Sequence, residues 1–248
     1  MDDAAGARPG VVRNRLRAPH EPLRTFHPRR SVLGPQREAA LQLLGQLGFS
    51  VHDDAAPPPL TAAGHLDTAA LFGRTAPVVL EIGSGMGEAV LAMAAADPGR
   101  DYLAVEAHVP GVATVLAVLR TGAPSNVRVA HGDALDLLRE RVAPDSLDAV
   151  HAFFPDPWPK ARHHKRRLVQ PDHVALIRAA LRPGGLLHLA TDWPEYADRM
   201  LEVLTADPGL VNAYEGFAPR PAHRPVTRFE ARGVAAGRPV ADLVFRRR

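Results

Sequence analysis

The sequence contains no cysteine among its 248 residues. Disulfide bonds, thiolate metal sites and a cysteine nucleophile are therefore excluded. No apolar run approaches the roughly 18 residues that a membrane-spanning helix needs. The N-terminus carries Asp2 and Asp3 and lacks the apolar core of a secretory signal. We therefore expect a cytoplasmic protein that has no membrane segment.

Lysine is almost absent, because the chain has only Lys160 and Lys165 against 28 arginines. Both lie in one stretch, 153–167, in which three alternating prolines surround Asp156 and Trp158 and a dense run of cations follows. Proline fixes φ and removes an N–H group, so the first half of the stretch must be a stiff loop. From these residues alone, two interpretations are open. The stretch either grips a base and its phosphates, or it is a rigid turn before a solvated basic segment.

Acidic residues are scarce in the first 33 residues, where Glu21 is the only acid after Asp3. Seven arginines lie in the same segment, and apolar anchors are few. We expect a basic, flexible arm over 1–33 that either orders on a polyanion or remains a solvated tail. Apolar residues make up 46% of the chain, which is enough for a single domain over 34–248. Within it, 52–64 is expected to be a loop or linker insert.

Short apolar runs alternate with helical patterns from residue 77 onward. This alternation is typical of an α/β protein with a mainly parallel sheet. A helix is expected to begin at Pro35 and to be closed by Gly48. Seven strands are expected, at 78–82, 102–105, 127–130, 147–154, 186–191, 210–214 and 240–245.

An acid stands at the end of each of the first five expected strands. In parallel sheets, ligands bind beyond the carboxyl ends of the strands, at the point where the strand order reverses. One such acid alone would more often be a helix cap or a turn residue. All five together predict a polar site at this edge, formed by Glu81, Glu106, Asp133, Asp156 and Asp192.

A glycine-rich turn, Gly83-x-Gly85-x-Gly87, follows the first of these strands. Such turns bring backbone close to a nucleotide at a helix N-terminus. Glu106 lies 19 residues beyond the last glycine (106 − 87), which suits the recognition of ribose hydroxyls in a dinucleotide fold. A dehydrogenase is therefore one interpretation.

Glu81 argues for a different cofactor, because a carboxylate is a poor neighbour for pyrophosphate but a good one for an ammonium or sulfonium group. The glycine spacing also departs from G-x-G-x-x-G. Asp133 can accept a hydrogen bond from an adenine amino group. Together these features favour S-adenosylmethionine.

Five segments also match a known family in their order along the chain: 80–87, 105–108, 154–167, 191–193 and 227–230. Over roughly Leu33 to Phe245 the chain resembles the bacterial tRNA (guanine-N7-)-methyltransferases, and the Pro-Asp-Pro-Trp-x-Lys block is the most specific part of the match. The resemblance implies a Rossmann-like class I methyltransferase fold with helices on both faces of the sheet. It also implies S-adenosylmethionine as the methyl donor and a variable-loop guanine of tRNA (conventional position 46) as the acceptor.

The resemblance assigns roles to residues. Cofactor contacts are implied for Glu81, Gly83, Gly85, Glu106, Asp133 and Asp156, and Asp156 is also the implied catalytic acid. Substrate binding is implied for Lys160, Asp192, Thr227, Arg228, Phe229 and Glu230. RNA binding is implied for Arg162, His163, His164, Lys165, Arg166 and Arg167.

The chemistry fits this assignment, because guanine N7 carries a lone pair and no proton, so its attack needs no general base. We expect Asp156 and Asp192 to hold the guanine, and Trp158 either to wall the pocket or to belong to the core.

No metal site and no obligate protein partner are expected, and the chain is expected to be a monomer or a weak homo-oligomer. Two alternatives remain: a nucleotide-binding oxidoreductase, and a non-catalytic RNA-binding subunit with the same fold.

Overall fold

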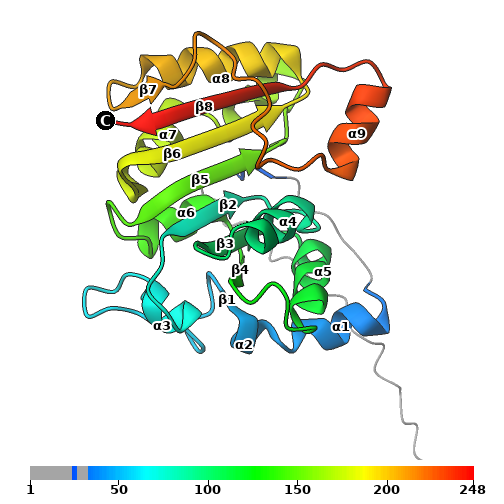
Figure 1. Cartoon of the computed structure of the whole chain (residues 1–248), viewed down its shortest axis with the longest axis vertical. Helices are drawn as coiled ribbons and strands as arrows, with labels where there is room; N and C mark the ends of the chain where they lie inside the picture. The colour runs from blue at the N-terminus through cyan, green and yellow to red at the C-terminus, as the bar shows by residue number, and fades with distance from the viewer. Residues whose placement is uncertain (1–23, 27–32) are drawn as a thin grey trace, which may run out of the picture.

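The computed structural model describes residues 24–26 and 33–248, so most of the arm predicted over 1–33 lies outside the described residues. The described chain is built on one eight-stranded sheet in the order β1-β4-β3-β2-β5-β6-β8-β7 (Figure 1). Neighbouring strands are parallel from β1 to β6, and β8 is antiparallel to both β6 and β7. The strands are β1 Gly48–Ser50, β2 Val78–Ile82, β3 Asp101–Glu106, β4 Val127–His131, β5 Leu147–Phe153, β6 Leu181–Thr191, β7 Leu210–Asn212 and β8 Ala241–Arg247.

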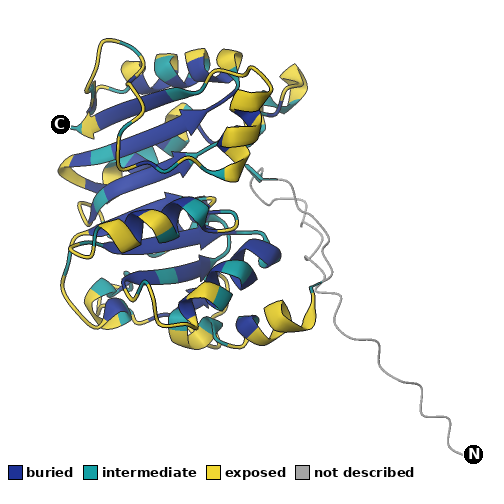
Figure 2. Ribbon diagram, turned by 45° about the vertical axis from the view of Figure 1, so that its right-hand side comes forward, coloured by how far each residue is buried: buried dark blue, intermediate teal, exposed yellow. Residues whose placement is uncertain are grey.

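Helices cover both faces of the sheet, as expected. One apolar cluster joins α1, α4 and α5 to the face of β2, β3 and β4, and the other joins α6, α7 and α8 to the opposite face (Figure 1). Figure 2 shows the strands buried between helices whose outer faces are exposed. The helices are α1 Pro35–Leu41, α2 Leu44–Leu47, α3 Thr68–Phe72, α4 Glu88–Ala96, α5 Val109–Leu119, α6 Ala134–Glu140, α7 Pro171–Ala180, α8 Pro194–Ala206 and α9 Arg228–Ala235, with a 3-10 helix η1 at Ala161–Arg166.

Strand β1 is the one strand that the sequence pattern missed, so the sheet has eight strands rather than seven. The helix predicted from Pro35 is divided into α1 and α2. Gly48 caps the end of α2, as predicted, and it also begins β1, where it pairs with Val129 of β4. A Cβ atom at Gly48 would lie 1.9 Å from the carbonyl oxygen of Val129. The glycine is therefore needed for the close pairing of β1 with β4. The sequence did not reveal this role, because a glycine after a helical pattern is explained by a helix end alone.

The order of the strands places the ligand crevice. From β2 the chain proceeds to β3 and β4 on one side, and it returns to β5 on the other side of β2. The loops after β2 and β5 therefore diverge at the carboxyl edge, which is where ligands bind in such sheets.

Among the described helices, none has both the length and the apolar character that crossing a bilayer requires.

Candidate active site

The glycine-rich loop after β2 has the conformation that its sequence predicts. Gly83, Gly85 and Gly87 have φ values of 70°, 57° and 82°, which only glycine adopts without a steric penalty. The backbone N–H groups of Gly83 and Ser84 both donate to the carbonyl oxygen of Val105, at 2.8 and 3.1 Å. The loop is therefore fastened to the end of β3 and leads directly into α4.

Gly111 in α5 is a residue of the site that sequence reasoning missed. A Cβ atom at this position would lie 2.3 Å from the carbonyl oxygen of Gly85 and 3.0 Å from Cγ of Glu106. Only glycine lets α5 pack this closely against the loop. The one available signal was a glycine inside an otherwise apolar helix.

Glu106 ends β3 and binds the glycine loop through its carboxylate. Oε2 accepts a hydrogen bond from the N–H of Gly85 at 2.7 Å, and Oε1 accepts one from the N–H of His108 at 2.6 Å. Burial raises the pKa of Glu106, the two backbone N–H groups partly oppose this, and the charge of Asp156 adds to the increase. A carboxylate has about four lone-pair sites, so Glu106 retains acceptor capacity toward a ligand.

Glu81 is a buried carboxyl group that lacks, within the described part of the chain, a hydrogen-bond donor for one of its oxygens. Its side chain lies at the end of β2 and is only 3% exposed. Among the described residues, nothing donates a hydrogen bond to its Oε2 atom. Burial, followed by the charge of Glu106, raises the pKa of Glu81 to about 8. A buried carboxyl group with an unused oxygen is a costly arrangement unless a cationic partner binds there.

Asp133 follows β4 and caps α6, because its Oδ1 accepts the N–H of Leu135 at 2.9 Å. Burial is the main reason that the pKa of Asp133 is raised. Its side chain also lines the cavity, so the cap and the expected contact with a ligand do not exclude each other.

A cavity of about 560 Å³ brings these groups together at the carboxyl edge of the sheet. Its lining combines carboxyl groups at the strand ends with aromatic and threonine side chains from distant segments. Of the residues predicted to bind the cofactor or the substrate, it is lined by Glu81, Gly83, Gly85, Glu106, Asp133, Asp156, Thr227, Arg228 and Phe229.

The proline loop after β5 delivers Asp156 to this cavity. The flanking residues Phe154 and Trp158 have positive φ values of 54° and 45°. Bulky side chains rarely adopt this region, which costs on the order of 1–3 kcal/mol per residue and is concentrated at functional sites. The N–H of Phe154 donates to the carbonyl oxygen of Ala190 at 2.7 Å, which fixes the start of the loop to β6.

Trp158 is buried under the proline loop and is not among the described residues that line the cavity. Its side chain is 3% exposed, and its Nε1–H donates to the carbonyl oxygen of Thr25 at 3.0 Å. The guanidinium group of Arg166 lies 4.3 Å from the ring centroid, and the ring of His163 meets its edge. Of the two interpretations of this tryptophan, the structure favours the core one.

The cationic run forms η1 and has an exposed side and a buried side. Lys160, Arg162 and Lys165 are exposed next to the loop that carries Asp156, and Arg166 and both histidines are partly buried. An edge with these three mobile cations is suited to phosphate groups. Their predicted contact with RNA stays a prediction.

Arg167 occupies a different place from the rest of the run. Its side chain is only 1% exposed, and its guanidinium group donates to both carboxylate oxygens of Glu195 and to the carbonyl oxygen of Pro157. The group also lies 4.7 Å from the ring of Tyr196 and contacts His164. This placement argues against the predicted direct contact of Arg167 with RNA and shows it fastening η1 to α8.

Asp192 ends β6 as expected but lies outside the set of described residues that line the cavity. Its Oδ2 accepts a hydrogen bond from Nε of Arg238 at 2.7 Å, and the residue is 8% exposed. The structure therefore joins Asp192 to the segment after α9.

The start of α9 forms the far wall of the cavity. Thr227 caps the helix, and the N–H of Arg228 donates to Oε2 of Glu88 at 2.7 Å. The ring of Phe229 lies 5.2 Å from that of Phe154 and is 53% exposed. Two aromatic rings from segments far apart in the sequence, the loop after β5 and the start of α9, therefore meet in the lining of the cavity.

Glu230 points away from the cavity into a buried ion-pair network. Its two carboxylate oxygens accept from Nη1 and Nη2 of Arg224 at 2.5 and 2.9 Å. The same guanidinium group donates to both oxygens of Asp242 in β8 at 2.7 and 2.9 Å. Glu230 therefore ties α9 to the sheet, and its predicted contact with substrate has no support from this placement.

Solved structures share the fold of this chain. The 16S rRNA methyltransferase KamB superposes with a TM-score of 0.56 at 18% identity, over 76% of this chain and 94% of that one. The aminoglycoside resistance methyltransferase NpmB1 gives a TM-score of 0.51 at 17% identity, over 77% and 95%. At these identities the likeness establishes the methyltransferase fold alone.

Sequence comparison reaches further. Residues 75–243 match the family model described as a putative methyltransferase. The tRNA (guanine-N(7)-)-methyltransferase of Burkholderia mallei is 56% identical over 73% of this chain and 69% of its own length. The enzymes of that name from Streptomyces avermitilis and Nitrosospira multiformis are 50% and 45% identical, over 91% and 93% of this chain and 75% and 97% of their own lengths. The chain therefore belongs to the tRNA (guanine-N(7)-)-methyltransferase family.

Proposed function

We propose that the chain transfers the methyl group of S-adenosylmethionine to N7 of a guanine in tRNA, and that this guanine is the variable-loop guanine at conventional position 46. The observation that carries the proposal is the buried Glu81 carboxyl group, which lacks a hydrogen-bond donor for Oε2 among the described residues and lies beside the glycine loop. When bound, S-adenosylmethionine supplies an electrophilic methyl group on a sulfonium.

The residues at the closed end of the cavity fit this cofactor. Glu81 would pair with the ammonium of its amino-acid part, and Glu106 would accept from the ribose hydroxyls with its remaining lone pairs. Asp133 would accept from the adenine amino group through the oxygen that does not cap α6. A dinucleotide would place its pyrophosphate near Glu81, whose buried carboxyl group offers no positive charge to a phosphate, so an oxidoreductase is not favoured.

The chain has two tasks toward the acceptor base. It must place N7 in line with the methyl group, and it must stabilise the positive charge that the base gains. Asp156 lines the cavity next to Phe154 and is suited to both tasks. Phe229 is exposed at the mouth and suited to stacking on the base. Asp192 could bind the guanine only after its hydrogen bond with Arg238 breaks.

The exposed cations next to Asp156 would hold the RNA backbone while the base enters the cavity. Pulling a base out of its tertiary contact costs a few kcal/mol. Contacts of Lys160, Arg162 and Lys165 with phosphates would offset that cost. We further propose that the chain acts in the cytoplasm without an obligate protein partner, as a monomer or weak homo-oligomer.

The proposal is tested by incubating the purified chain, without other proteins, with labelled S-adenosylmethionine and unmodified tRNA. We expect label in tRNA and strand scission at position 46 under the chemistry specific for N7-methylguanine. Asp156→Asn should lower kcat by about 100-fold or more, a typical loss for one electrostatic group. The matched control is Asp198→Asn, at an exposed carboxylate of α8. Absence of label, or scission at another position, would contradict the proposal.

A further inference from the structure

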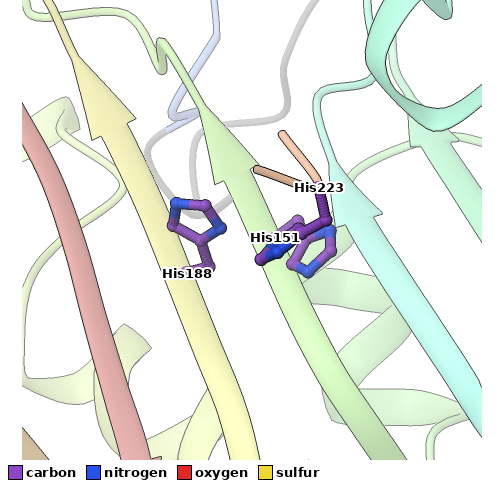
Figure 3. A group of neighbouring side chains, drawn as sticks. All are labelled: His151, His188 and His223. Atoms are coloured by element: carbon purple, nitrogen blue, oxygen red, sulfur yellow. The ribbon is translucent and has the colours of Figure 1, made fainter. Parts of the chain in front are cut away.

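Three histidines that do not line the cavity meet on the face of the sheet that carries α4 and α5, next to the cavity residue Phe153. His151 of β5 and His188 of β6 are register partners on neighbouring parallel strands. His223 belongs to the segment between β7 and α9, which crosses β8 and β6 in Figure 1. Figure 3 shows the three rings turned toward one another, and their ligand nitrogens all lie within 4.8 Å of one another.

The two buried histidines have unused ring nitrogens. His151 is 1% exposed, and nothing in the described part of the chain bonds to its Nδ1 or its Nε2. His188 is fully buried, and its Nδ1 is likewise without a partner among the described residues. Leaving a buried polar atom unsatisfied costs about 1–3 kcal/mol, so these nitrogens need a partner.

We propose that His151, His188 and His223 bind one divalent transition metal ion, with zinc as the preferred ion. Neutral imidazole is a ligand that suits zinc, and three protein ligands leave a fourth tetrahedral position for solvent. That position faces outward, because His223 lies at the exposed side of the cluster.

Asp242 gives His188 the orientation that a metal ligand requires. Nε2 of His188 lies 2.8 Å from Oδ1 of Asp242, which leaves Nδ1 as the free nitrogen. A histidine ligand almost always donates its other N–H to a carboxylate or carbonyl in this way. The carboxylate is itself held by Arg224, so the ring of His188 is fixed before any ion binds.

The spacing of the three rings suits one ion after a small adjustment of the side chains. The ring centroids lie 5.8, 6.1 and 5.4 Å apart. Zinc–nitrogen bonds of about 2.0–2.1 Å place tetrahedral ligand nitrogens about 3.4 Å apart. Strand pairing holds the backbones of His151 and His188, so these two rings can adjust only by turning their side chains, whereas His223 lies in an irregular exposed segment and can approach further.

Nearby positive charges do not exclude a cation, because each is paired. Arg224 follows His223 in sequence and is bound by Glu230 and Asp242. The charge of Arg100 also acts on His151, and Arg100 is bound by two further carboxylates, Asp97 and Asp148.

A bound ion would fasten the segment after β7 to the middle of the sheet. This segment leads into α9, whose first turn lines the cavity. The site would therefore stabilise one wall of the active site without taking part in methyl transfer. The inference does not depend on the proposed reaction, because metal binding is measured directly.

The test uses the full chain without a polyhistidine tag, freed of metal with a chelator and then titrated with Zn²⁺ or Co²⁺. We expect one ion per chain, the strong visible bands of tetrahedral Co²⁺, and a higher melting temperature with Zn²⁺. His223→Asn should weaken Zn²⁺ binding at least about 100-fold, beyond the 10–100-fold typical of outer-sphere partners. Because His223 is exposed, this variant is expected to fold.

His65→Asn is the matched control, since His65 lies in the loop before α3 and outside the cluster. It should leave Zn²⁺ affinity and the cobalt spectrum unchanged. His151→Phe removes a buried ligand and should abolish the cobalt bands while methyl transfer to tRNA persists. Absence of stoichiometric binding, or binding that His223→Asn does not weaken, would overturn the proposal.

Discussion

At the scale of single residues, Glu81 makes cofactor binding depend on pH. Its pKa of about 8 means that the carboxyl group is largely protonated at neutral pH before a ligand binds. Pairing with an ammonium requires the carboxylate, so binding must release a proton. We expect cofactor affinity to rise as pH increases from about 6 to 8, by at most about tenfold per unit. Calorimetry at pH 7 in buffers of different ionisation enthalpy should detect the release of close to one proton.

Glu81→Gln is the control for this prediction. It should bind the cofactor more weakly and release no proton. The same variant reports on stability, because a raised folded-state pKa favours folding below the usual value near 4.5 and loses this contribution as pH rises toward 8. Without cofactor, Glu81→Gln should be more stable than the parent at pH 9, by up to a few kcal/mol. Equal stability at pH 9 would show that Glu81 is not desolvated.

At the scale of elements, α9 is attached to the sheet by the buried pair of Glu230 and Arg224. Both side chains are almost fully buried, so, among the described residues, removing Glu230 leaves Arg224 paired with Asp242 alone and its Nη1–H group without an acceptor. Glu230→Ala should lower the free energy of unfolding by about 1–3 kcal/mol, measured by urea denaturation. Because the first turn of α9 lines the cavity, cofactor affinity should fall as well.

Glu202→Ala in α8 is the matched control, since Glu202 forms a surface pair with Arg199 at 2.7 Å. Exposed pairs contribute about 0–1 kcal/mol, so this variant should unfold nearly as the parent does. Equal losses in the two variants would mean that the Arg224 network does not hold α9 in place.

At the scale of the whole molecule, the acids at strand ends were the most predictable part of the site. Buried strands are continuous apolar runs, and parallel strands share one carboxyl edge, so sequence alone could bring Glu81, Glu106, Asp133 and Asp156 together. The same argument could not show that Asp192 turns to Arg238, because that contact depends on how the segment after α9 folds back.

Features that depend on contacts between distant segments could not be predicted. Residues 151, 188 and 223 are far apart in the sequence, and only the pairing of β5 with β6 and the path of the later segment unite them. A periodic pattern also cannot distinguish a buried arginine from an exposed one. Arg167 therefore looked like one more RNA-binding cation, although Glu195 and Tyr196 enclose it.

The distribution of charge over the molecule predicts how salt affects tRNA binding. The net charge is only +3, so affinity for RNA depends on where cations gather, and three exposed cations lie next to the loop that carries Asp156. The triple variant Lys160→Ala, Arg162→Ala and Lys165→Ala should lower the slope of log K against log[salt] by about 0.7–0.9 for each phosphate that the variant no longer neutralises. Fluorescence anisotropy with labelled tRNA measures this slope.

The charge-matched control, Arg37→Ala, Arg120→Ala and Arg246→Ala, removes three exposed cations from other regions and should leave the slope nearly unchanged. Equal slopes for the two triple variants would mean that the overall charge of the chain, and not η1 and its flanking lysine, holds the RNA.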